Sequence, residues 1–245
     1  MNGVEVCARG RRFGLIAAAL LACAPGAAAA AASRVLTVST ADGARYAGGH
    51  YPPLPLADHE VVLTFDDGPE PDVTPKILTA LRAHRVHATF FMIGAKAERA
   101  ASTARAVARA GHTIGSHTSS HANFGDLGAA AQVREIDLGI AQIRRALGPH
   151  DLSPLFRFVQ LRDTPESLAH LTAVSVAPLD VDIDSEDWRG DPPAVTKARL
   201  LERLARLRKG VILLHDAQPN TAALLPDLLR TLDAEGYRIV ELRTH

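Results

Sequence analysis

Short apolar runs and amphipathic stretches alternate from residue 60 to residue 242, and no two strand-type runs follow each other over most of this length. Residues 61–63 are the first apolar run, and residues 75–85 then repeat apolar side chains at helical spacing. This alternation predicts a parallel sheet covered by helices, because each parallel connection needs a crossover. Counting gives about seven βα units, close to the eight of a TIM barrel, in a single α/β domain.

The first 32 residues have the composition of an export signal. Three arginines precede an apolar run at 13–22, and an alanine-rich stretch follows at 24–32. The apolar run is shorter than the roughly 20 residues that a membrane-spanning helix needs. Residues 20–23 are similar to a bacterial lipobox, which makes Cys23 a candidate for lipidation, although leucine is large for its second position. We therefore expect an exported protein, periplasmic, envelope-bound or secreted, with no transmembrane span after cleavage.

The rest of the chain lacks cysteine and carries almost no net charge. Both cysteines, Cys7 and Cys23, lie within residues 1–32, so a structural disulfide is not expected and any metal must be held by His, Asp or Glu. Of the 27 basic and 27 acidic residues of the chain, three arginines and Glu5 lie within residues 1–32, which leaves 24 basic and 26 acidic residues and no basic stripe that would favour nucleic acid as a partner. Residues 33–58 are rich in Ser, Thr, Gly and Pro and read as a tether ahead of a catalytic domain at 59–245.

Two adjacent acids end the first apolar run. Asp66 and Asp67 close this run, and Gly68-Pro69 turns the chain immediately afterwards. Enzymes with parallel sheets place their reactive groups at the carboxyl ends of strands. The two carboxylates are therefore candidates for chemistry.

Two histidines, His117 and His121, are spaced four residues apart after another short strand-type run. On a helical turn this spacing would place both imidazoles on one face, although a bare pair is also common among solvated and core histidines. Because the ends of parallel strands align, Asp67, His117 and His121 could bind one divalent metal with a coordination position left open. Asp66 would then be free to act as a base.

Five short motifs resemble, in the same order, those of the polysaccharide deacetylases. They are TFDDGP at 64–69, HTSSH at 117–121, FR at 156–157, DSEDW at 184–188 and LLH at 213–215. The resemblance, to the NodB homology domain of carbohydrate esterase family 4, spans about residues 60–242. It implies a distorted (β/α) barrel, usually of seven strands, and metal-dependent hydrolysis of an N-acetyl or O-acetyl group on a sugar polymer.

The resemblance also implies roles for the residues of the first three motifs. Asp66 would take a proton from the attacking water, and Arg157 would orient it. Asp67, His117 and His121 would hold a divalent ion, with Zn²⁺ expected first and Co²⁺ or another divalent ion as alternatives.

The last two motifs would supply the acid and the pocket for the acetyl group. His215 would protonate the departing amine, and Asp184 would pair with this histidine. Trp188 and Leu213 would wall the acetyl methyl, although Leu213 fits a plain core position equally well.

The third motif departs from the family pattern. Arg157 is followed by Phe158, Val159 and Gln160, without the usual proline and with glutamine where a small or aromatic residue is expected. The family uses a backbone N–H of this loop to stabilise the oxyanion, and a displacement of about one ångström can cost about a hundredfold in rate. The departure puts the level of activity and the fit of the substrate in question.

The sequence as a whole predicts a monomeric, metal-dependent deacetylase of N-acetylglucosamine polymers such as peptidoglycan, chitin-like chains or poly-N-acetylglucosamine. One alternative is an O-acetyl esterase or small-amide hydrolase on the same barrel. Another is a weakly active homologue that binds the cell wall. Outside the motifs, His112 is expected at the surface, and the acids around 180–191 are expected mostly in a solvated loop.

Overall fold

The computed structural model describes residues 1–3 and 34–245 of the chain. The fold described here is that of residues 34–245, which lie within the unit Ala32–His245. Cys23 and all of the expected export signal after residue 3 lie outside the described residues. Within the described ranges, no helix combines the length and the hydropathy that crossing a membrane requires.

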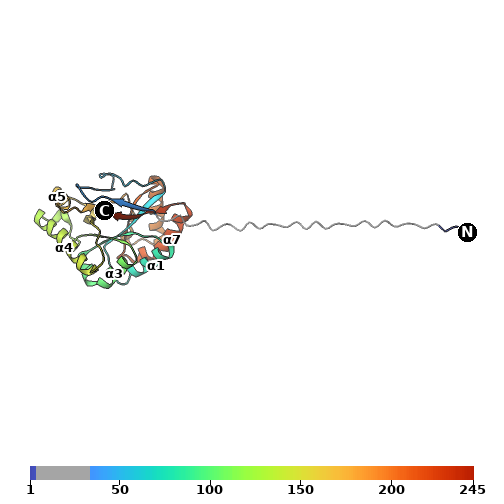
Figure 1. Ribbon diagram of the computed structural model, residues 1–245, viewed down its shortest axis with the longest axis horizontal. Helices are drawn as coiled ribbons and strands as arrows, with labels where there is room; N and C mark the ends of the chain where they lie inside the picture. The colour runs from blue at the N-terminus through green and yellow to red at the C-terminus, as the bar shows by residue number, and fades with distance from the viewer. Residues whose placement is uncertain (4–33) are drawn as a thin grey trace. The chain divides into compact units, whose positions relative to one another are not determined.

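A curled parallel sheet forms the centre of the domain, as Figure 1 shows. Seven strands follow one path in the order β6-β5-β4-β3-β2-β8-β7, and β9 pairs with the amino end of β2. The prediction of a distorted (β/α) barrel of about seven strands is confirmed. The strands are β2 (Glu60–Asp66), β3 (Thr89–Met92), β4 (Thr113–Ser116), β5 (Leu155–Phe156), β6 (Ala177–Pro178), β7 (Ile183–Asp184), β8 (Gly210–His215) and β9 (Arg238–Ile239).

Helices connect the strands. They are α1 (Thr74–His84), α2 (Gly94–Arg99), α3 (Ala101–Arg109), α4 (Ala129–Leu147), α5 (Pro165–Ala173), α6 (Pro193–Leu207) and α7 (Pro219–Ala234), with short 3-10 turns at Phe124–Asp126, Val159–Leu161 and Asp187–Arg189. The alanine-rich stretch at 97–110 is divided between α2 and α3 at Ala100, whose φ of −116° and ψ of 43° leave the helical region. An alanine carries no stop signal, so periodicity could not locate this break.

Side chains of strand β2 point alternately into two core clusters, one on each face of the sheet. Val61, Leu63 and Phe65 belong to the cluster that packs against the helices. Val62 belongs to the other cluster, on the inner face of the curled sheet. Because side chains alternate along a strand, Asp66 lies on the same inner face as Val62. The last residue of β2 is therefore presented to the barrel interior.

The segment expected as a tether is folded into the domain instead. Strand β1 (Val35–Val38) pairs in parallel with β10 (Glu241–Thr244), as the blue and red strands of Figure 1 show. Leu36 and Leu54 are buried, and Tyr46 forms a bridge to Leu179 beyond the β6 edge. The prediction of a tether was wrong because a composition of Ser, Gly and Pro does not reveal a few well-placed apolar anchors.

Candidate functional site

The reactive groups of the first and last motifs meet because β2 and β8 are neighbours in register. Asp66 lies opposite His215 in this pair, and the backbone N–H of Asp216 donates to the carbonyl of Asp66 at 3.1 Å. Asp67 follows in the left-handed region, with a φ of 75°. A non-glycine residue in this region costs about 1–2 kcal/mol, and such residues cluster at functional sites. The turn thus directs the two adjacent carboxylates to different partners.

Asp67, His117 and His121 converge on one point, with one ligand atom from each lying within 4.8 Å of the others. Nε2 of His117 lies 3.4 Å from Oδ1 of Asp67, and Nε2 of His121 lies 3.1 Å from it. This carboxylate oxygen is buried and has no hydrogen-bond partner. Nδ1 of His117 donates to the carbonyl of Arg157 at 2.8 Å, which leaves its Nε2 with a lone pair. A buried carboxylate oxygen without a hydrogen-bond partner that faces two imidazole nitrogens fits a divalent cation.

The two histidines lie on an irregular loop, so the helical turn expected for them is absent. Thr118 and His121 have φ values of 68° and 65°. Hydrogen bonds hold this shape: Gly94 N donates to Thr118 O, Ala95 N donates to Ser119 O, and the carboxylate of Glu135 accepts from two backbone N–H groups of the loop. The loop is therefore fixed by α2 on one side and by α4 on the other.

Helix α4 approaches this loop closely at Gly139. A Cβ atom at this position would lie 2.4 Å from the carbonyl carbon of Thr118. Only glycine allows such an approach without moving the loop. The sequence of α4 thus contributes to the position of the two histidines without providing a ligand.

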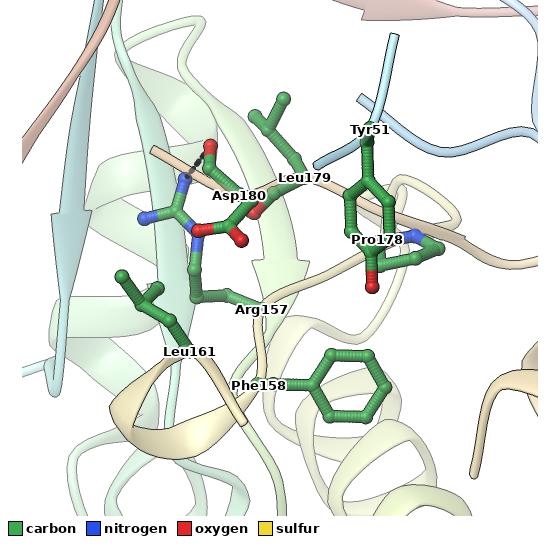
Figure 2. Close-up of a pocket in the computed structure, with 7 residues that line it drawn as sticks. All are labelled: Tyr51, Arg157, Phe158, Leu161, Pro178, Leu179 and Asp180. Carbon is green, nitrogen blue, oxygen red and sulfur yellow. Dashed lines mark hydrogen bonds between the residues drawn. The ribbon is translucent and has the colours of Figure 1, made fainter. Parts of the chain in front are cut away.

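Arg157 holds the carboxylate of Asp66 from inside the barrel. Its Nη1 donates to both oxygens of Asp66, at 3.1 and 3.2 Å, and to Oγ1 of Thr64 at 3.1 Å. Figure 2 shows the rest of the guanidinium directed at the backbone carbonyls of Leu179 and Asp180. The Arg157 side chain is 1% exposed and Asp66 is 3% exposed, so the ion pair is almost free of solvent screening. The structure thus places Arg157 where the sequence predicted an orienting group.

The acid that pairs with His215 is Asp187, and the prediction of Asp184 was wrong. Nδ1 of His215 lies 2.6 Å from Oδ1 of Asp187, whose Oδ2 accepts from the His215 backbone and from Thr221. Glu186 adopts a left-handed φ of 53°, which turns the chain so that Asp187 points inward. The carboxylate of Asp184 accepts from the backbone N–H of Glu186 instead.

His215 is held in its protonated form. Burial alone lowers the pKa of an imidazole, but the hydrogen bond and the charge of Asp187, with smaller contributions from Asp66 and Asp67, outweigh it and raise the pKa of His215 to about 9. The Nδ1–H donates to Asp187, which leaves Nε2 to carry a transferable proton. The arrangement suits a general acid at neutral pH.

Two cavities meet at Asp67 and His121, which line both of them. The first, which we call the acid–base arm, has a volume of about 460 Å³, and its other lining residues include Asp66, Gln160, Asp184, Trp188, Leu213 and His215. The second, the basic arm, has a volume of about 360 Å³ and is also lined by Ile93, Ala95, Lys96, Arg99 and Ser120. Every predicted pocket residue therefore lies in the acid–base arm.

Three buried polar residues escaped the sequence analysis. Asp216 is 1% exposed; one of its oxygens accepts from Thr74 and the other has no partner, and burial raises its pKa to about 7. Asp180 was expected in a solvated loop but is buried beside Arg157. His112 was expected at the surface but is buried, and its Nδ1 accepts from the backbone N–H of Ala88. Burial lowers the pKa of His112 to about 4. An acid directly after a buried strand was the available signal for Asp216.

Comparisons with known proteins agree with these motifs. A family model described as polysaccharide deacetylase matches residues 55–169. A peptidoglycan-N-acetylglucosamine deacetylase of Bacillus cereus is 50% identical over 70 residues, which make up 29% of this chain. The match covers 26% of that relative, so the chain spans about a quarter of its length.

Longer matches extend over most of the domain. A chitooligosaccharide deacetylase of Azorhizobium caulinodans is 31% identical over 194 residues, which cover 75% of this chain and 88% of that protein. The solved structure of a peptidoglycan deacetylase from Bdellovibrio bacteriovorus is similar with a TM-score of 0.78 and 30% identity, covering 86% of this chain and 59% of that one. With this extent of similarity and the convergence of the first, second and fifth motifs at one end of the barrel, the chain belongs to the polysaccharide deacetylase family.

Proposed function

We propose that the protein is a metal-dependent deacetylase that hydrolyses N-acetyl groups of an N-acetylglucosamine-containing polysaccharide and releases acetate. The observation that carries this proposal is the orphaned oxygen of Asp67, which faces two imidazole nitrogens beside a buried base and a protonated acid. The relatives named as peptidoglycan and chitooligosaccharide deacetylases support this substrate class. A location in the cell envelope would give the protein access to peptidoglycan.

Asp67, His117 and His121 would hold the metal, and Zn²⁺ suits a set of two imidazoles and one carboxylate. A bound divalent ion supplies Lewis-acid chemistry, which activates water and polarises the acetyl carbonyl. Asp66 takes the proton from the attacking water. Arg157 holds this carboxylate in place through a buried ion pair, with Nη1 of Arg157 3.1 Å from Oδ1 of Asp66.

His215 then donates a proton from Nε2 to the departing sugar amine. This step needs an imidazolium, and the raised pKa of His215 provides one at neutral pH. Asp187 acts through His215, since it fixes the tautomer and stabilises the charge. Trp188 and Leu213 line the same cavity and would receive the acetyl methyl group.

The test is an acetate-release assay on the metal-loaded protein, with chitin oligomers, peptidoglycan glycan strands and acetylated xylan as substrates. We expect release from the N-acetyl glycans, and we expect Asp66→Asn to lower kcat by about 10²–10⁴-fold while metal binding is kept. Equal release by the variant would sink the assignment of the base. Release from acetylated xylan alone would point to an O-acetyl esterase.

A weakly active wall-binding protein is a second candidate because of the third motif. Gln160 and Leu161 are both left-handed, with φ values of 54° and 57°, although neither is glycine. This unusual backbone lies in the loop that should complete the oxyanion site. Binding of glycan strands without acetate release by the metal-loaded parent protein would favour this candidate.

A further inference from the structure

The basic arm contains two cations that the proposed chemistry does not use. Lys96 and Arg99 lie three residues apart on α2, which places them on one side of the helix, and both line the cavity that Asp67 and His121 share with the acid–base arm. Arg99 makes no ion pair with another described residue, and Lys96 makes one long ion pair, with Glu70 at 3.8 Å. The basic arm therefore presents positive charge that its own acidic neighbours neutralise only in part.

Helix α2 is fixed relative to the metal ligands. Its first two backbone N–H groups donate to the carbonyls of Thr118 and Ser119, between His117 and His121. Gly94, at the start of α2, packs so closely on α4 that a Cβ atom would lie 2.8 Å from the Cα atom of Gly139. The backbone that carries the two cations is thus held at a constant distance from the site of hydrolysis.

The two arms differ in charge. Asp67 lines both arms; apart from it, the acid–base arm contains the carboxylates of Asp66 and Asp184 together with His215, whereas the basic arm contains Lys96 and Arg99 and no further acid. A glycan that crosses the site from one arm to the other would be favoured if an anionic group lies on the side of α2. A volume of about 360 Å³ lies within the range of about 300–1,000 Å³ that is usual for small-ligand sites.

We propose that the basic arm binds a carboxylate carried by the sugar next to the one that is deacetylated. The substrate would then be an acidic acetamido glycan, such as a chain with lactyl ether carboxylates on alternate sugars, bound in one direction along the cleft. This proposal rests on the proposed function and narrows its substrate class. Exposed charge pairs change an equilibrium by up to about fivefold each, so the two cations together account for a preference of about five- to tenfold.

The experiment compares two forms of one tetrasaccharide of alternating N-acetylglucosamine and N-acetylmuramic acid, the free acid and its methyl ester, with chitotetraose as a neutral reference. The quantity measured is the ratio of kcat/KM for the free acid to that for the ester. We expect a ratio of about five to ten for the parent protein, falling to about one in the Lys96→Gln/Arg99→Gln variant. The ratio of the parent should also fall as ionic strength rises.

A matched control removes the same charge elsewhere. Arg109 and Arg134 are exposed and line neither arm, so the Arg109→Gln/Arg134→Gln variant should keep the ratio of the parent. A parent ratio near one, or an equal fall in the control, would overturn the proposal.

The proposed function and this inference fail in different ways. If the parent protein releases no acetate from any glycan, the proposed function fails, and calorimetric binding of the free acid and of the ester still tests the basic arm. Binding of the free acid that is no tighter than binding of the ester would then reject it. Preference for the acid that persists in the Lys96→Gln/Arg99→Gln variant would reject it as well.

Discussion

The two arms of the cleft share Asp67 and His121 but are built in different ways. Groups in the acid–base arm extend from strand ends and are supported by buried partners, since Arg157 is 1% exposed and Asp187 is fully buried. The cations of the basic arm lie on a six-residue helix, and Arg99 is exposed. Proton transfer requires fixed geometry, whereas attraction between charges tolerates movement. Changes in the first arm should affect every substrate, and changes in the second should affect only charged ones.

The largest effect is expected from Asp187→Asn in the acid–base arm. Below its pKa of about 9, His215 is protonated and competent as an acid. Removing the charge of Asp187 lets burial dominate, so the pKa of His215 falls and activity is lost at a lower pH than in the parent protein. We expect kcat at neutral pH to fall about a hundredfold for neutral and acidic glycans alike, as measured by a pH–rate profile.

The matched control for this change is Asp184→Asn, which removes a carboxylate from the same cavity. Asp184 makes no hydrogen bond to His215. The alkaline limb of the pH–rate profile of Asp184→Asn should therefore stay close to that of the parent protein. An alkaline limb that moves more in Asp184→Asn than in Asp187→Asn would restore the pairing expected from the sequence.

Metal binding at the junction of the two arms should have the next largest effect. Zn²⁺ at 100 times its dissociation constant stabilises the folded state by about 2.7 kcal/mol, which corresponds to a rise in Tm of about 5–10 °C for a domain of this size. Calorimetry of the metal-stripped protein with and without Zn²⁺ measures this rise. It should be lost in Asp67→Asn and kept in Asp72→Asn, which changes an exposed acid in the same loop. An equal rise in both variants would place the ion elsewhere.

The smallest effect is expected from Trp188→Ala. This side chain is 56% exposed, so it contributes a partly open wall and little to stability. We expect KM to rise about three- to tenfold by the same factor for the free-acid glycan and for its ester, as steady-state kinetics would measure. A loss confined to the acidic glycan would show that the two arms are not independent.

The fold and the reactive strand ends could be predicted because their signals are local. Apolar runs that end in Asp66 and in His215 indicate which side chains reach the carboxyl edge of a parallel sheet. Which acid pairs with His215, Asp184 or Asp187, depends instead on the left-handed conformation of Glu186. The periodicity of apolar residues does not predict this conformation. Side-chain direction after a strand is set by the turn, and turns of non-glycine residues with positive φ have weak sequence signals.

Burial of polar residues was the second limit. Asp216 and His112 are polar by type and lie outside the five motifs, and the sequence analysis placed neither in the interior. Their burial depends on partners distant in the chain, such as Thr74 for Asp216. The roles proposed for the catalytic and metal-binding residues stay predictions until the assays are made.

Strand β1 gives the domain a boundary that differs from the start of the family-model match. The family match begins at residue 55, but Leu36, Val38 and Leu54 are buried and β1 pairs with the last strand, β10. A gene fragment cut at residue 55 would therefore encode every motif but would leave β10 with an unpaired edge, which is a template for aggregation. A fragment of this domain for expression or for recombination should therefore begin near residue 34. We expect chimaeras that keep β1 together with β10 to be more soluble than those that separate the two strands.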